Sequence, residues 1–189
     1  IKKIDIFTSH HTHNVIVTGA NDPQKMDPKA SRETLDHSIM YIFAVALEDA
    51  NWHHVKSYTK KRANKKSTIK IWKSIKTHED KKWTKKYHDP NPKNKSFGAK
   101  VIVTLNNGKK IIEKLDRADA HPYGQRPFVR KNYINKFLTL TKGIISKKES
   151  DRFLKVVQKL KKLKPGQLNS LNIEVRSSQL KKNNKKGIF

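Results

Sequence analysis

The segment from Ile39 to Leu47 constrains the fold of this chain more than any other stretch. It reads IMYIFAVAL, and it is apolar on nearly every side of the helix that its residues favour. A helix with this pattern is buried, so the rest of the chain has to cover it. Ser31 suits an N-cap and Glu33 a first helical turn, so we expect one helix to begin there and continue through the segment.

The composition of the chain limits how the apolar helix can be buried. Hydrophobic residues make up 34% of the 189-residue chain, which is low for a self-contained globule, so we expect a partner surface to help bury the core. There is no Cys, which excludes disulfides, zinc ribbons and thiol nucleophiles within this sequence. No apolar run reaches membrane-spanning length. Neither a signal peptide nor an initiator Met opens the chain, and we expect an N-terminal part to be missing.

Strand signals appear in three places. IKKIDIF alternates apolar and polar residues, which indicates a strand, and VIV at residues 15–17 reads as a second extended piece. The clearest local pattern is AKVIVTLNNGKKIIEKL, where two strand-like runs flank Asn107-Gly108 and predict a hairpin with a two-residue type I′ turn. Residues 52–89 are basic, and we expect short helices and loops there.

Helical signals dominate the C-terminal third. KNYINKFLTLT has apolar residues at helical spacing. Ser146 and Glu149 predict a capping box, and the helix that follows should end at Lys164-Pro165-Gly166. The polar, basic residues 177–189 are predicted to be disordered. Together these patterns predict an α+β fold with a small antiparallel sheet, one buried helix and closing helices.

The charge of the chain has two interpretations. A formal net charge of +27 points, taken alone, to nucleic acid or an acidic membrane surface. However, 36 of the 43 basic residues are Lys, and Lys, Asn and Ile are the residues that an AT-rich genome favours. Nucleic-acid readers rely more on Arg for forked contacts. A basic nucleic-acid-binding module is the non-enzymatic alternative, and it would need aromatic platforms on an exposed basic face.

Histidines recur in two short motifs. In HHTH, His10, His11 and His13 could share a metal if they alternated along a strand, but no acidic or Cys ligand lies nearby in the sequence. A solvated edge is therefore the favoured interpretation. The pair in WHHV follows the apolar helix at once, which favours a role at the helix end. We expect no metal site.

The stretch DHSIMY carries the first candidate site. His37 and Tyr41 lie four residues apart on an apolar helix, and with Thr34 and Ser38 they form one polar stripe. Burying such groups without partners costs about 1–3 kcal/mol each. The stripe therefore either makes hydrogen bonds in the core or faces a substrate cavity.

The stretch HPYGQRPFVR carries the second candidate site. Arg126, Arg130 and His121 surround turn residues close to a predicted helix start. They are either surface residues of a turn or an anion site, because a guanidinium binds carboxylate in a planar, bidentate way and a helix N-terminus favours negative charge. There is no Gly-rich phosphate cradle, so a nucleotide ligand is not indicated.

Three separated motifs occur in one order along the chain: SRETLDHSIMYIFAVALEDANWHH, KYHDPNPKNKSFGAKVIVTLNNGK and ADAHPYGQRPFVRKNYINKFLTL. With them the sequence resembles the C-terminal region of the MmgE/PrpD family, and within that family it looks most like the bacterial 2-methylcitrate dehydratases. The resemblance runs from about Ile1 to Val175 and leaves out the Lys-rich tail.

The resemblance implies a two-domain enzyme that needs no metal or organic cofactor. Residues 1–128 would be its α+β lid, and residues 129–176 would be helices that return to the large helical domain. Residues 177–189 would be a basic tail. Family members are usually homodimers, and we expect a cytoplasmic protein with no membrane and no specific nucleic-acid partner.

The implied reaction is the elimination of water from 2-methylcitrate, a tricarboxylate, to 2-methyl-aconitate in propionate breakdown. Tyr41 matches a family position that lines the active site, and His37 lies one turn before it, so both are expected to be catalytic. The residues expected to bind the substrate are His121, Tyr123, Arg126 and Arg130. The family's other acid and base residues would lie upstream, so the chain alone is expected to be inactive. Relatives that decarboxylate cis-aconitate or epimerise a dicarboxylate derivative are the enzymatic alternatives.

Overall fold

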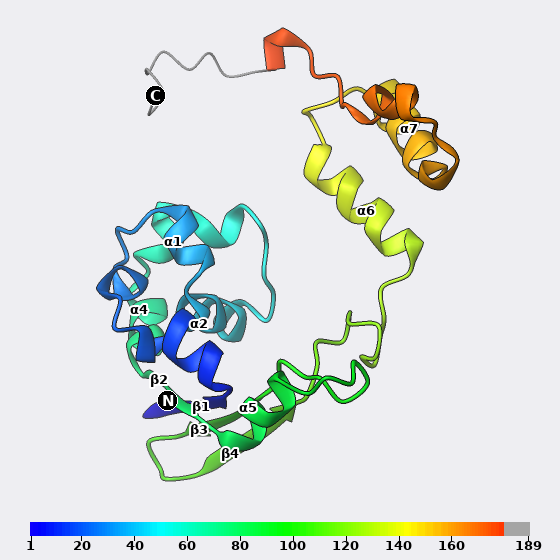
Figure 1. Ribbon diagram of the computed structural model, residues 1–189. Coiled ribbons are helices and arrows are strands. Elements are labelled where there is room, and N and C mark those ends of the chain that lie inside the picture. The colour runs from blue at the N-terminus through cyan, green and yellow to red at the C-terminus, as the bar shows by residue number, and fades with distance from the viewer. Residues whose placement is uncertain (180–189) are drawn as a thin grey trace. The chain divides into compact units, whose positions relative to one another are not determined.

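The computed structural model describes residues 1–179 and has two compact units, Ile1–Gln125 and Arg126–Phe189 (Figure 1). The first unit combines a four-stranded sheet with helices, and the second is helical in its described part. The predicted α+β class is confirmed. No helix within residues 1–179 is long and apolar enough to cross a membrane.

The sheet is mixed, whereas the sequence predicted an antiparallel one. Its strands are β1 (Lys3–Thr8), β2 (Ile75–Glu79), β3 (Ala99–Thr104) and β4 (Lys110–Leu115), in the order β2-β1-β3-β4. β1 pairs with β2 in parallel and with β3 antiparallel, and β3 pairs antiparallel with β4. β2 was missed because its five residues lie among lysines and carry only a short alternation.

The hairpin between β3 and β4 lies where predicted, but its turn is different. Leu105 N donates to Lys109 O at 2.8 Å, and Gly108 N donates to Leu105 O at 3.0 Å. Gly108 has φ +84°, whereas Asn107 is not among the residues with positive φ. A type I′ turn would need positive φ at both central residues. The loop is therefore a three-residue turn in which glycine takes the left-handed position.

The connection from β1 to β2 contains most of the helices of the first unit. They are the short helices η1 (Thr12–Ile16), η2 (Thr18–Ala20), η3 (Pro23–Met26) and η4 (Lys56–Tyr58) and the α-helices α1 (Arg32–Asp36), α2 (Ile39–Asp49), α3 (Lys60–Ala63) and α4 (Lys66–Lys73). The predicted extended piece at residues 15–17 was wrong. η1 covers its first two residues, because His13 N bonds Ser9 O at 2.9 Å and turns the chain into a helix.

One continuous helix through residues 32–49 was also a wrong prediction. The chain breaks at Ser38, whose hydroxyl accepts from Tyr41 N at 3.3 Å and donates to Lys25 O at 2.8 Å, so that it caps α2. Ser31 caps α1, as predicted. α2 is buried on one face, and its Leu47 is 43% exposed.

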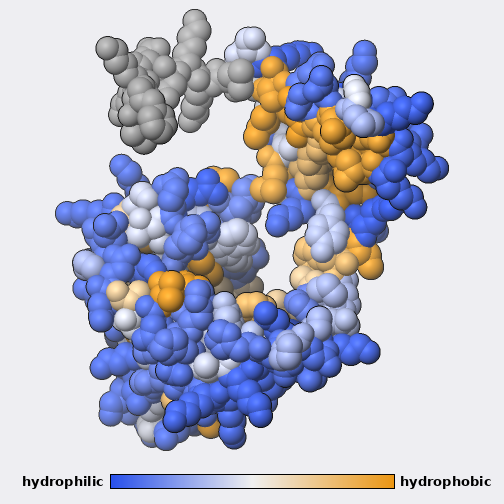
Figure 2. Space-filling view, viewed as in Figure 1, coloured by the Kyte–Doolittle hydropathy of each residue, from blue (hydrophilic) through white to orange (hydrophobic). Residues whose placement is uncertain are grey.

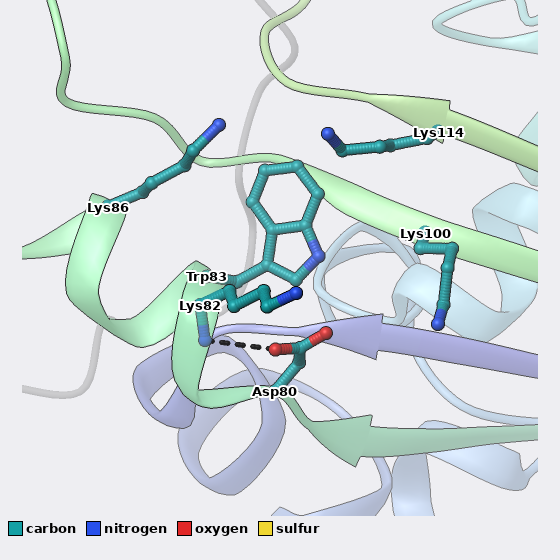
Figure 3. A pocket seen from close by; sticks show the side chains of 6 residues that line it. All are labelled: Asp80, Lys82, Trp83, Lys86, Lys100 and Lys114. Carbon is teal, nitrogen blue, oxygen red and sulfur yellow. Dashed lines mark hydrogen bonds between the residues drawn. The ribbon is translucent and has the colours of Figure 1, made fainter.

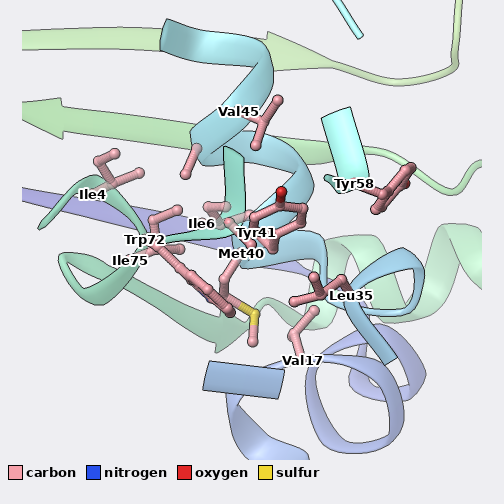
Figure 4. Packing of buried hydrophobic residues seen from close by; sticks show 12 residues of the cluster. Ile4, Ile6, Val17, Leu35, Met40, Tyr41, Val45, Tyr58, Trp72 and Ile75 are labelled. Atoms are coloured by element: carbon pink, nitrogen blue, oxygen red, sulfur yellow. The ribbon is translucent and has the colours of Figure 1, made fainter. Parts of the chain in front are cut away.

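The core of the first unit lies between one face of the sheet and the helices α2 and α4. Ile4 and Ile6 of β1 and Ile75 of β2 supply its sheet side, and Tyr41 and Trp72 pack edge to face at 5.0 Å between ring centroids (Figure 4). Trp72 is fully buried. The cluster ties both ends of the long connection to the sheet.

A network of ion pairs and hydrogen bonds joins the end of α2 to α3 and α4 beside the core. Arg62 Nη2 contacts Glu48 Oε2 and Asp49 Oδ1, each at 2.9 Å. Glu48 also accepts from Ser67, from Thr68 at 2.6 Å and from Lys65 at 2.9 Å. Burial by itself raises the pKa of Glu48, but the hydrogen bonds from Ser67, Thr68, Lys65 and Arg62 outweigh it and lower the pKa to about 2.

This network makes the fold sensitive to acid. The folded pKa of Glu48 lies below its ordinary 4.5, so its contribution to stability is present above pH 4.5 and is lost as the pH falls towards 2. We expect Glu48→Gln to lower the free energy of unfolding at pH 7 by roughly 1–3 kcal/mol and to flatten its decline in that pH window. Urea unfolding monitored by tryptophan fluorescence measures both effects. The control is Glu113→Gln on the exposed strand β4, and equal effects of the two substitutions would contradict the assignment.

The second unit holds α6 (Arg130–Thr141) and α7 (Lys147–Val157), followed by η5 (Leu160–Lys162), η6 (Pro165–Leu171) and η7 (Ser177–Gln179). α7 ends at Val157, well before the predicted Lys164-Pro165-Gly166. Residues 177–179 form a short turn of 3-10 helix where disorder was predicted, and residues 180–189 lie outside the described part.

The capping box at α7 is only half formed. Ser146 Oγ accepts from Glu149 N at 3.2 Å, as predicted. The Glu149 carboxylate instead accepts from Arg152 at 2.6 Å and from Glu174 N at 2.9 Å, and Arg152 also donates to Ser170 O. These contacts fasten the following segment to α7.

Apolar side chains gather on the exposed surface of the second unit, in orange in Figure 2. Leu138, Leu140, Ile144 and Leu160 are each more than 40% exposed. The described part of this unit therefore leaves apolar surface uncovered.

Candidate functional site

The predicted anion site begins in the turn that follows β4. His121 N donates to Ala118 O at 2.9 Å, and Gly124 N donates to His121 O at 2.7 Å. A Cβ atom added at Gly124 would lie 2.3 Å from Ala118 O and 2.4 Å from Asp119 O. The chain folds back so tightly that only glycine fits there, which fixes where the neighbouring side chains lie.

Two predicted residues and one that was missed come together at this turn. The rings of His121 and Tyr123 lie 5.8 Å apart, and the Arg117 guanidinium lies 5.7 Å from the centre of the Tyr123 ring. Arg117 Nε donates to Lys95 O at 3.2 Å, which ties the turn to the loop before β3. We call Arg117, His121 and Tyr123 the turn cluster. Arg117 could have been found from the sequence, because it directly precedes the turn and is one of only 7 Arg in the chain.

The two predicted arginines begin the second unit. Arg126 is its first residue, and Arg130 is the first residue of α6. Both side chains are exposed. Asn132 Oδ1 accepts from Val129 N at 3.0 Å and closes the first turn of α6. Because the unit boundary falls between Gln125 and Arg126, the structure does not place these arginines relative to the turn cluster.

Tyr41 lies in the core of the first unit. Its side chain is fully buried, and its hydroxyl donates to Ser57 O at 2.5 Å. Burial raises the pKa of the phenol, so the side chain stays neutral. In this chain the hydroxyl makes the core hydrogen bond that was one of the two interpretations of its sequence pattern.

His37 lies on the surface, between α1 and α2. Its Nδ1 donates to Glu33 O at 2.8 Å. The break at Ser38 separates it from the helix that carries Tyr41, so the predicted polar stripe does not form. The structure does not bring His37 and Tyr41 together at one cavity.

The histidines of HHTH have partners within the first unit. His10 Nδ1 lies 2.9 Å from Glu79 Oε2, and His13 Nδ1 lies 2.7 Å from Thr77 Oγ1. The ring of His11 stacks on Tyr87 with 5.2 Å between centroids. Within residues 1–179 there is no group of three or more His, Cys, Asp or Glu side chains that could hold a metal ion.

A mixed sheet with a helical crossover, followed by a helical unit, defines an α+β domain with a basic turn at its edge. The sequence model of the MmgE/PrpD C-terminal domain matches residues 1–162. That match covers most of the chain, and the chain belongs to the MmgE/PrpD family. The family includes dehydratases and other lyases.

The tight turn can be tested directly. Gly124→Ala places a methyl group against two carbonyl oxygens, and we expect it to lower the free energy of unfolding by about 1–3 kcal/mol. The matched control is Gly166→Ala, where nothing lies within 4 Å of the added Cβ and which should be neutral or slightly stabilising. Thermal melts followed by circular dichroism compare the two. A Gly124→Ala chain as stable as the control would show that the turn is loose.

Proposed function

We propose that this chain is the C-terminal domain of a 2-methylcitrate dehydratase, which eliminates water from 2-methylcitrate to form 2-methyl-aconitate. The observation that carries the proposal is the family match over residues 1–162. The motif DAHPYGQRPF, which looks most like the dehydratase version of this turn, supports the choice of reaction.

The chemistry of the reaction suits the residues of this region. A proton leaves a carbon next to a carboxylate and a hydroxyl leaves its neighbour, so the site needs a base, an acid and cations that hold three carboxylates. We propose that Arg126 and Arg130 hold substrate carboxylates. We also propose that His121 and Tyr123 bind the substrate, and that Arg117 fixes the Tyr123 ring.

For proton transfer we propose His37 and Tyr41, as the family resemblance implies. The exposed ring of His37 is held by the bond from its Nδ1 to Glu33 O, which orients the imidazole. Tyr41 would reach a substrate only if its hydroxyl exchanged the bond to Ser57 O for one to the substrate. We further propose that residues 1–128 act as the lid, that the helices beyond them pack on a helical domain, and that the enzyme is a cytoplasmic homodimer.

The arginine assignment predicts a large effect of a charge-conserving change. In an MmgE/PrpD enzyme that carries this chain as its C-terminal domain, Arg126→Lys should lower kcat/KM for 2-methylcitrate about ten- to a hundredfold, or roughly 1.5–3 kcal/mol. Lysine keeps the charge but loses the planar fork that binds carboxylate. Lys161→Ala, in the exposed turn η5, is the control and should be nearly neutral.

Steady-state kinetics on both variants, with thermal melts to check folding, measures this difference. Unchanged efficiency in a well-folded Arg126→Lys enzyme would make the turn a surface feature. The parent enzyme should also be assayed with cis-aconitate. Decarboxylation of cis-aconitate without dehydration of 2-methylcitrate would overturn the proposed reaction and leave the family unchanged.

A further inference from the structure

A group of basic side chains lies on the face of the sheet that points away from the hydrophobic core. Val101 and Val103 of β3 face the core, so Lys100 between Ala99 and Val101 projects to the opposite side. Lys114 of β4 pairs directly with Lys100 and shares that face. The helix α5 (Lys81–Tyr87) follows β2 and brings Trp83 against Lys114, whereas Lys100 Nζ lies 4.4 Å from the centre of the Phe7 ring.

Trp83 forms the apolar wall of a small pocket. Trp83 as a residue is only 3% exposed, and a Cβ atom added at Gly98 would lie 2.3 Å from its ring. Lys86 Nζ and Lys114 Nζ lie 5.1 and 5.5 Å from the ring centre. The cavity has a volume of about 270 Å³, and its lining residues are Asp80, Lys82, Trp83, Lys86, Lys100 and Lys114 (Figure 3).

The charges of this pocket are unbalanced. Lys100 and Lys114 stand directly opposite each other on neighbouring strands, an arrangement of like charges that destabilises a sheet. Asp116 offsets part of the excess, because it contacts Lys86 and lies 3.3 Å from Lys114. Asp80 accepts from Lys82 N at 2.9 Å and caps α5. Four lysines line the pocket, and Asp80 and Asp116 supply two carboxylates beside them, so the pocket keeps an excess of positive charge.

We propose that this pocket binds a small phosphate monoester, with the phosphate among the ammonium groups of the lysines that line it. All the cations that line it are lysines, which bind phosphate as point charges, and none is a guanidinium that would bind an anion in a planar, bidentate way. A phosphate monoester carries about −1.5 to −2 charge near pH 7 and three acceptor oxygens, which suits a cluster of ammonium donors. Bound phosphate would also relieve the repulsion between Lys100 and Lys114.

Calorimetric titration of the 189-residue chain with phenyl phosphate, at about 150 mM NaCl, tests the proposal. The pocket variant is Lys100→Met with Lys114→Met, which keeps the alkyl chains and removes two charges. The control is Lys66→Met with Lys70→Met on the exposed face of α4, which changes the net charge equally. We expect the pocket variant to bind about tenfold or more weakly and the control to change by less than about twofold.

Thermal melts provide a second measurement. Phenyl phosphate should raise the Tm of the parent and the control but not that of the pocket variant. Arg126→Lys should bind phenyl phosphate like the parent chain, which separates this site from the proposed substrate site.

Three results would overturn the proposal. One is the absence of saturable binding by the parent chain, and another is equal weakening in the pocket and control variants, which would mean binding to the lysine surface in general. The third is displacement of phenyl phosphate by citrate or by single-stranded DNA at lower concentration than by inorganic phosphate. That result would assign the pocket to carboxylates or to nucleic acid.

Discussion

The parallel pairing of β1 with β2 is the interaction on which the first unit depends. It joins Ile4 to Ile75 and Ile6 to Thr77, so it closes the connection that carries most of the helices. Thr18 Oγ1 accepts from Thr77 N at 3.0 Å and covers part of the outer edge of β2. Loop-closure entropy opposes such a long-range pair, and the burial of Trp72 and its neighbours against the paired strands supplies the compensation.

The basic residues of the two proposed sites form two groups that differ in residue type. The turn after β4 places Arg117 beside Tyr123, and arginines continue into the second unit at Arg126 and Arg130. On the face of the sheet opposite the core, the cations that line the pocket beside Trp83 are all lysines. Guanidinium and ammonium groups differ in geometry rather than in charge, and we propose a different anion for each group of residues. Some of the basic residues are therefore grouped by type at particular places in the fold, although lysine covers much of the remaining surface.

The sequence predicted local structure correctly where a single residue or short motif determines the conformation. The N-caps at Ser31 and Ser146 and the position of the β3–β4 hairpin were predicted correctly. The errors occur where distant groups compete with a local pattern. Ser38 looked like part of a polar stripe, but its bond to Lys25 O, thirteen residues away, helps to end one helix and begin another. β2 has little strand signal of its own and is held by its partner β1.

By itself the sequence determined the α+β class, the family resemblance and the residue types of the candidate sites. Only the tertiary structure decided how these residues are used. Tyr41 had two interpretations until its hydroxyl was seen to bond Ser57 O within the core. Trp83, Lys100 and Lys114 come from one helix and two strands, and no local pattern links them. Side-chain period and cap chemistry act over a few residues, whereas a pocket forms only where the packing of a sheet brings distant residues together.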